Sequence, residues 1–256
     1  MKRKEFEDAR NWHRRGFIPH YDASDKYQMV TYRLADSLPI DALKLGAPHS
    51  NADEMTKKRK ADLSPLGAPH SNADEMTKKR KLTENFLDQS HGSCLLQTPK
   101  VAQKQIEAWE YFNGERYELI AYVVMPNHVH LLIKTYPSWP LSQLVASWKK
   151  HVTYFVQKDK DLWQQYRESY LQDRKAFLNY KSTLGENESD LKNRTKPSAL
   201  ECGAPSSKIY LWQNEYWDRF IRNENHFQNA IHYILENPVK AGLVNSEGKW
   251  PWSAVL

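Results

Sequence analysis

Two histidines separated by one residue lie inside an apolar run, AYVVMPNHVHLLIK, at residues 121–134. Side chains of a β-strand point alternately to its two faces, so His128 and His130 share one face and Val129 lies on the other. Imidazole nitrogens bind several divalent ions. The pair therefore predicts part of a metal site whose remaining ligands come from elsewhere, with two purely structural histidines at a sheet face as the alternative.

A tyrosine and an asparagine form a second candidate pair near the end of the chain. Tyr233 and Asn237 stand four residues apart in a predicted helix, so they share a face. A tyrosine beside a metal-polarised phosphate can act as a nucleophile, and an asparagine offers a carbonyl oxygen. Alternatively, Tyr233 belongs to an apolar stripe and the Asn237–Pro238 step ends the helix. Glu236 is a further candidate metal neighbour, or a solvated surface carboxylate.

The elements that must position these residues follow from the periodicity of the apolar residues. Strands are predicted at Tyr27–Ala35, Tyr117–Met125 and His128–Lys134, the last two joined by a tight turn at Pro126–Asn127. Helices are predicted at Val101–Asn113, Leu141–Lys158 and Glu224–Pro238. This order fits an α+β fold with a ferredoxin-like, RRM-like antiparallel sheet. Helices cover one face, the histidines lie on the open face, and a C-terminal helix is added.

Two polar segments interrupt this order of elements. The unit LGAPHSNADEMTKKRK occurs at residues 45–60 and again, letter for letter, at residues 66–81. Two copies with almost no apolar residues cannot stack into a solenoid, so residues 45–82 are predicted to be a duplicated polar insertion, a loop or disordered. Residues 178–207 are rich in Ser, Asn, Gly, Pro and charge, and are predicted to be a second insertion. The whole chain, residues 1–256, is then one domain with two insertions.

Composition narrows the classes of partner. The 256 residues include 37 Lys and Arg against 31 Asp and Glu, a formal net charge of +6, which suits a polyanion such as nucleic acid. No apolar run approaches the roughly 20 residues of a membrane span, and the N-terminus lacks the apolar region of a signal peptide. A cytoplasmic protein without a membrane partner is therefore expected. The two cysteines, Cys94 and Cys202, predict neither a disulfide framework nor a zinc cluster.

Three phrases carry a resemblance to a known family. VVMPNHVHLLI, WQNEYWDRFIRNENHFQNAIHYILENPVKAGLV and WPWSA resemble the REP-associated tyrosine transposases, a branch of the single-tyrosine HUH transposases. HUH denotes histidine, bulky hydrophobe, histidine, and residues 128–130 match it. The resemblance implies Tyr233 as nucleophile, Asn237 as third ligand beside the histidines, and Mg²⁺ or Mn²⁺ as cofactor. It also implies nicking and joining of single-stranded DNA at hairpins through a 5'-phosphotyrosine.

DNA binding is expected from basic and aromatic side chains around the open face. Candidates for phosphate contacts are Lys149, Lys150, Arg219 and Arg222, and Trp217 is a candidate for stacking on an unpaired base. Each of them could also be an ordinary surface or core residue. Trp250 and Trp252, in the WPWSA tail, are expected to fold back on the core. The protein is expected to act as a monomer or a homodimer.

Two other functions compete with the transposase hypothesis. One is a catalytically inactive or domesticated protein that binds DNA hairpins without cutting them, which the recent duplication makes worth considering. The other is a metal phosphodiesterase that uses activated water and forms no bond to DNA. A covalent adduct with DNA would separate the transposase from both.

Overall fold

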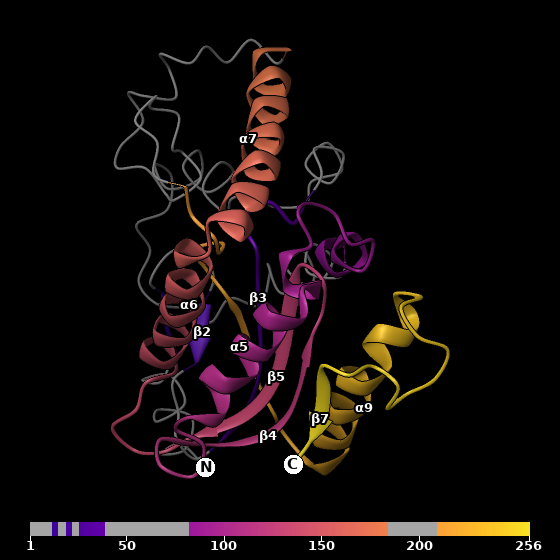
Figure 1. Cartoon of the computed structure of the whole chain (residues 1–256). Helices are drawn as coiled ribbons and strands as arrows, with labels where there is room; N and C mark the ends of the chain where they lie inside the picture. Colours follow the sequence, from indigo (N-terminus) through magenta and orange to yellow (C-terminus); the bar gives the residue numbers. More distant parts are fainter. Residues whose placement is uncertain (1–11, 15–18, 22–25, 39–81, 184–208) are drawn as a thin grey trace, which may run out of the picture.

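A five-stranded antiparallel sheet forms the centre of the computed structural model, which describes residues 12–14, 19–21, 26–38, 82–183 and 209–256 (Figure 1). The strands are β3 (Tyr27–Arg33), β4 (Tyr117–Val124), β5 (His128–Thr135), β6 (Trp217–Phe220) and β7 (Ser253–Val255). Their order in the sheet is β6-β3-β5-β4-β7. A separate pair, β1 (Trp12–Arg14) and β2 (Pro19–Tyr21), is also antiparallel.

The first four strands of this sheet have the topology expected of a ferredoxin-like fold. Along the chain, β3 is followed by α5 (Pro99–Glu110), then β4, β5, α6 (Leu141–Lys158) and β6. The spatial order β6-β3-β5-β4 places each βαβ crossover across one intervening strand. The predicted α+β fold is therefore confirmed, and α6 has the bounds that were predicted for it. The fourth strand, β6, was not predicted, because its four residues include only two that favour strands.

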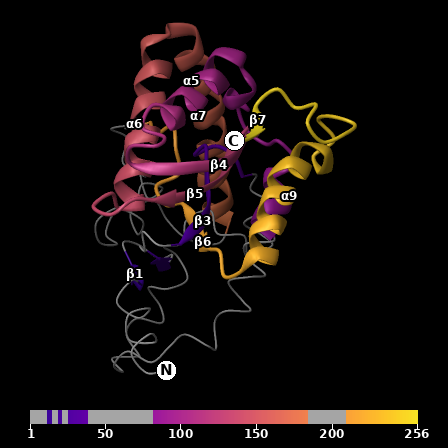
Figure 2. The same cartoon turned by 90° about the horizontal axis from the view of Figure 1, so that it is seen from below.

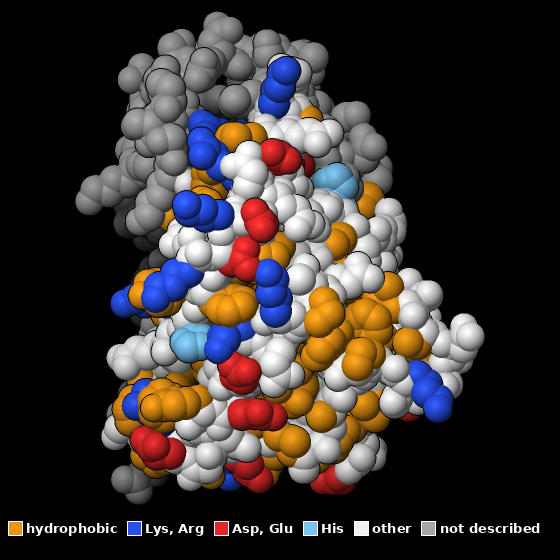
Figure 3. All heavy atoms as spheres, viewed as in Figure 1, with side chains coloured by type: hydrophobic (Ala, Val, Ile, Leu, Met, Phe, Trp, Pro, Cys, Tyr) orange, Lys and Arg blue, Asp and Glu red, His pale blue; other side chains and the backbone are white. Residues whose placement is uncertain are grey.

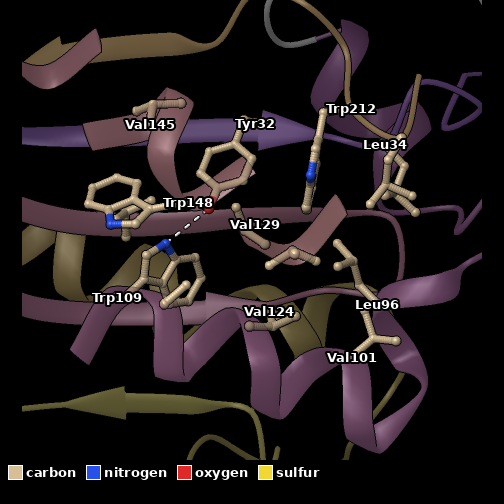
Figure 4. Close-up of a cluster of buried hydrophobic side chains, with 14 of the residues drawn as sticks. Tyr32, Leu34, Leu96, Val101, Trp109, Val124, Val129, Val145, Trp148 and Trp212 are labelled. Carbon is tan, nitrogen blue, oxygen red and sulfur yellow. Dashed lines mark hydrogen bonds between the residues drawn. The ribbon is translucent and has the colours of Figure 1, made fainter. Parts of the chain in front are cut away.

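One face of the sheet packs on α5 and α6. The strands contribute alternate residues to this main core, among them Tyr32 and Val129, and the helices contribute Trp109 and Trp148 (Figure 4). The indole nitrogen of Trp109 donates a hydrogen bond to the hydroxyl of Tyr32 over 2.9 Å, which the dashed line in Figure 4 marks. Because the side chains on this face are apolar and those pointing away from the helices' buried side are mostly polar, the periodicities of the helices could be recognised in the sequence.

The opposite face, which was predicted to be open, is partly covered by α9 (Glu224–Lys240), the predicted C-terminal helix. Figure 2 shows the sheet between α9 on one side and α5 and α6 on the other. A smaller core forms under α9 from Val123, Met125, Leu132 and Ile234, among others. Because β4 and β5 also carry apolar residues on this face, burying them against an amphipathic helix is favourable.

Helix α7 (Lys160–Thr183) contradicts part of the prediction for the second insertion. Residues 178–183 were assigned to a polar loop, yet they continue this 24-residue helix. The helix begins directly after α6, and Tyr166 anchors its first half because its hydroxyl donates to the carbonyl of Tyr210 over 2.6 Å. The rest of the second insertion, and the first apart from residue 82, lie outside the described residues.

The end of the chain returns to the sheet. Strand β7 pairs with β4, and the indole nitrogen of Trp250 donates to the carbonyl of Val124 over 2.8 Å. Trp252 packs against the main core, so the expected return of both tryptophans is confirmed. Pro238 lies inside α9, which continues for two residues beyond the predicted end.

Within the parts of the chain that the structure describes, no helix combines the length and apolar character needed to cross a membrane.

Candidate metal and nucleophile site

The two histidines lie side by side at the start of β5, on the face that α9 covers. They point to the same side as Leu132, which belongs to the small core under α9, and each side chain is 1% exposed. Their Nε2 atoms are 3.1 Å apart, and their ring centroids are 4.8 Å apart. The prediction that they share a face is confirmed, and the two ε nitrogens face each other.

The two δ nitrogens have neighbours of their own. His128 Nδ1 lies 2.8 Å from Oδ1 of Asn127, the last residue of the turn between β4 and β5. His130 Nδ1 lies 2.7 Å from Oγ1 of Thr31, which stands directly opposite His130 in the β3–β5 ladder. Because each δ nitrogen already has a polar neighbour, Nε2 is the nitrogen of each ring that can bind a metal ion.

Burial keeps the first of these imidazoles neutral. The pKa of His128 is well below its ordinary value of 6.5, first because burial penalises the charged form and then because of the charges of His130 and Arg33. Arg33 stands opposite His128 in the β3–β5 ladder. A neutral imidazole has a lone pair for a metal ion, so this environment favours ligation at neutral pH.

Helix α9 brings Tyr233 and Asn237 to the same face of the sheet. The ring centroid of Tyr233 lies 5.1 Å from that of His130, in an edge-on arrangement, and Tyr233 is partly exposed. One turn later, Asn237 is 1% exposed. Its Oδ1 is one of ten buried side-chain atoms that lack a hydrogen-bond partner among the described residues. The structure thus places the predicted nucleophile beside the histidine pair.

These side chains fit a divalent cation. Leaving a buried polar atom unpaired costs about 1–3 kcal/mol, so the bare Oδ1 of Asn237 calls for a physical explanation. A cation would supply it, since imidazole nitrogens bind ions such as Zn²⁺ and Ni²⁺ and a carbonyl oxygen binds Mn²⁺ or Mg²⁺, so this mixed donor set can hold a divalent ion without selecting one. Mg²⁺ prefers oxygen and would keep several waters. The donors His128, His130 and Asn237 are those that the family resemblance implied.

Glu236 has other partners. Its carboxylate lies 2.5 Å from Nζ of Lys240 and 3.6 Å from Nε2 of His232, and Lys240 lowers the pKa of this carboxyl group. Glu247 lies 3.2 Å from the other ring nitrogen of His232. These exposed and half-exposed groups form a surface ion-pair network, which supports the solvated alternative for Glu236.

Two of the candidate DNA-binding residues lie on the face of the histidine pair. In the β3–β6 ladder, Trp217 stands opposite Thr31 and Arg219 stands opposite Met29. Residues directly opposite one another in paired strands point to the same face, so the side chains of His130, Thr31 and Trp217 form one row across three strands. Trp217 is partly exposed and Arg219 is exposed. Arg222 is exposed just before α9 begins.

The two candidate lysines lie in the other layer, on α6. The side chain of Lys149 does not lie on the open face, where it was expected; it is half-buried, and its Nζ donates to the carbonyls of Gln213 and Asn214 over 2.8 and 3.2 Å. Burial and then the charge of Arg33 lower the pKa of Lys149 to about 7. Lys150 is exposed, on a helix layer where basic side chains mix with acidic and apolar ones (Figure 3). The structure therefore does not bring these lysines to the histidine face.

Sequence reasoning missed the two residues that contact the δ nitrogens. Asn127 was treated only as part of a tight turn, although an asparagine directly before the first histidine was a usable signal. Thr31 gave no signal, because its position opposite His130 depends on the register between β3 and β5.

Comparisons with known proteins agree with the resemblance seen in the sequence. Residues 95–183 match the model of a family described as "Transposase IS200 like". This range contains both histidines and ends before Tyr233 and Asn237. The chain is 33% identical over 71 residues to the REP-associated tyrosine transposase of Escherichia coli (strain K12), covering 28% of this chain and 43% of that protein. The resemblance to the REP-associated tyrosine transposases is confirmed.

Two further matches complete the comparison. A putative REP-associated tyrosine transposase of Haemophilus influenzae (strain ATCC 51907 / DSM 11121 / KW20 / Rd) is 39% identical over 44 residues, covering 17% of this chain and 25% of that protein. The chain thus matches less than half of the length of either curated relative. A solved REP-associated tyrosine transposase bound to a REP hairpin aligns with a TM-score of 0.40 and 15% identity, covering 93% of this chain and 81% of that chain.

Proposed function

We propose that this protein is a metal-dependent transposase that nicks single-stranded DNA at hairpin-forming sequences and transfers the cut strand through a covalent bond to Tyr233. The observation that carries the proposal is the contact between Tyr233 on α9 and His130 on β5, with ring centroids 5.1 Å apart. Residues far apart in the sequence thereby place a phenol next to two facing imidazoles. The names of the curated relatives and the matched family model support the same activity.

The chemistry assigned to Tyr233 is an in-line attack on a DNA phosphate. The phenol oxygen forms a bond to phosphorus and loses its proton, while the bond from phosphorus to the 3'-oxygen breaks and that oxygen leaves as a hydroxyl. The product is a 5'-phosphotyrosine, and attack by a second 3'-hydroxyl would release Tyr233 and join the strands. A divalent ion held by His128, His130 and Asn237 would neutralise the negative charge that grows on the non-bridging oxygens.

The edge of the sheet beside the site offers a path for the DNA strand. Trp217 lies in the same cross-strand row as His130, and its partly exposed indole would stack on an unpaired base. Arg219 is exposed on the same face of β6, Arg222 is exposed where β6 has ended, and both would pair with phosphates. Lys149 is left out of this proposal, because two backbone carbonyls already accept hydrogen bonds from its ammonium group.

A denaturing gel tests the proposal. The full chain is incubated with labelled single-stranded hairpin DNA from the flanks of its own gene, with Mn²⁺ or with EDTA, beside Tyr233→Phe and Tyr154→Phe. Tyr154 is a matched control, since it is 59% exposed and lies on α6 in the other layer. We expect a Mn²⁺-dependent protein–DNA band with wild type and Tyr154→Phe and none with Tyr233→Phe.

Two other results would replace the proposal. Cleaved DNA without a covalent band, undiminished in Tyr233→Phe, would indicate a phosphodiesterase that uses water. Hairpin DNA that binds in a native gel but is neither cut nor linked under any metal condition would indicate a binding protein without activity. The oligomeric state and the cytoplasmic location stay predictions.

A further inference from the structure

Asn127 has a side-chain orientation that its neighbours determine. It is fully buried, and its Nδ2 donates to the backbone carbonyls of His91 and Ser37 over 3.0 and 3.5 Å. Carbonyl oxygens only accept hydrogen bonds, so the amide nitrogen must face them and Oδ1 must face His128. An amide oxygen is also only an acceptor. His128 therefore carries its proton on Nδ1, and its Nε2 holds a lone pair.

Thr31 places no such restriction on His130. Its hydroxyl lies 2.7 Å from Nδ1 of His130, and a hydroxyl can either donate or accept. The tautomer of His130 must then follow from its other nitrogen. That Nε2 lies 3.1 Å from Nε2 of His128, which is an acceptor. In the metal-free protein His130 must therefore carry its proton on Nε2, and Thr31 must donate to Nδ1.

A metal ion requires the opposite arrangement at His130. Both Nε2 atoms must then present lone pairs, so the proton of His130 has to leave Nε2. The ring remains neutral if a proton arrives at Nδ1, where the oxygen of Thr31 can accept a hydrogen bond from it. His130 loses a proton from Nε2 and gains one at Nδ1, so the change of tautomer involves no net uptake or release of protons.

We propose that Asn127 and Thr31 are positioning residues of two different kinds. Asn127 holds His128 permanently in the tautomer that binds a metal ion, whereas Thr31 rotates its hydroxyl and allows His130 to change tautomer when the ion binds. This inference rests on the proposed function, because it takes the histidine pair to be the ion site. Neighbours that orient metal-binding histidines commonly change metal affinity 10–100-fold when they are replaced.

Replacement of Thr31 tests the inference on DNA-free protein. Thr31→Val keeps the shape of the side chain and removes the hydroxyl, while Thr31→Ser keeps the hydroxyl and is the matched control. We expect Thr31→Val to bind Mn²⁺ at least about tenfold more weakly than wild type by calorimetry, and Thr31→Ser to stay within about threefold. Equal affinity of Thr31→Val and wild type would overturn the role of Thr31.

A spectroscopic test needs no variant. Two-bond ¹H–¹⁵N spectra of the histidine-labelled full chain distinguish Nδ1–H from Nε2–H rings. We expect His128 as Nδ1–H throughout, and His130 as Nε2–H without metal and Nδ1–H with bound Zn²⁺. An Nε2–H ring at His128, or an unchanged ring at His130, would overturn the inference, as would a wild type that binds neither ion.

These outcomes are separate from those of the proposed function. Affinity for Mn²⁺ that depends on Thr31, together with no covalent band on the gel, would reject the transposase activity and keep the positioning roles. A covalent band, together with Mn²⁺ affinity unchanged in Thr31→Val, would keep the activity and reject the role of Thr31.

Discussion

The two faces of one sheet differ in the chemistry of their buried side chains. On the face covered by α5 and α6, aromatic side chains are linked by hydrogen bonds, as Trp109 donates to Tyr32 and Trp148 donates to Tyr117 over 3.2 Å, while Ser142 Oγ is buried there without a partner. On the face covered by α9, two imidazoles face each other and the amide oxygen of Asn237 is buried without a partner. Strands β3 and β5 supply both faces through alternate residues. One face is a mainly aromatic and aliphatic core, and the other holds the side chains of the candidate metal site.

The largest expected change in stability comes from a large-to-small substitution in the aromatic core. Trp109→Ala should lower the free energy of unfolding by about 3–5 kcal/mol, because a fully buried indole leaves a cavity and a lost hydrogen bond. Urea unfolding of wild type and variant measures the loss. Adduct formation per folded molecule should persist at low temperature, whereas specific loss of activity in folded protein would show that the two faces are not independent.

Replacing Asn237 on the other face should raise the free energy of unfolding instead of lowering it. Asn237→Leu replaces a buried amide that lacks a partner at Oδ1 with an apolar group of similar size. We expect the metal-free protein to be about 1–2 kcal/mol more stable in urea, and Mn²⁺ binding and the covalent band to be strongly reduced. A destabilised variant that still binds Mn²⁺ as wild type does would remove Asn237 from the ligand set.

The histidine face should also make stability depend on pH. Because the folded pKa of His128 is well below 6.5, the unfolded chain takes up a proton there at mildly acidic pH and the folded chain does not. Stability is therefore expected to fall as pH drops below about 6.5. The loss from this residue is about 1 kcal/mol between pH 6.5 and 5.5. Urea unfolding across this range should show a shallower fall in His128→Gln, and equal slopes would contradict the assignment.

The smallest effect is expected from shortening the first insertion. The described residues on its two sides are joined at the site, since Asp36 accepts a hydrogen bond from the backbone nitrogen of Ser93 over 2.7 Å and Asn127 donates to the carbonyls of Ser37 and His91. Replacing residues 45–81 with a short Gly-Ser linker should change the free energy of unfolding by only about 0.6 kcal/mol per halving of loop length. Mn²⁺ affinity should be unchanged, and a marked loss would show that the insertion supports the histidine face.

Helices and strands were predicted well wherever their apolar residues followed one clear periodicity. Leu141–Lys158 was predicted with its observed bounds, because its apolar stripe is long and regular. The strand bearing His128 and His130 was predicted within one residue of its end. The short strand β6 and the polar helix α7 were missed, since four residues carry too little pattern and a charged helix resembles a loop in composition.

The sequence by itself determined that His128 and His130 share a face and that Tyr233 and Asn237 share another, because strand and helix periods are local properties. Only the tertiary structure decided that α9 lies over β5, so that Tyr233 meets His130. It also decided that Thr31 and Trp217 stand in the row of His130, and that Lys149 points into the other layer. Strand register and helix docking depend on long-range pairing between distant segments, which no local period encodes.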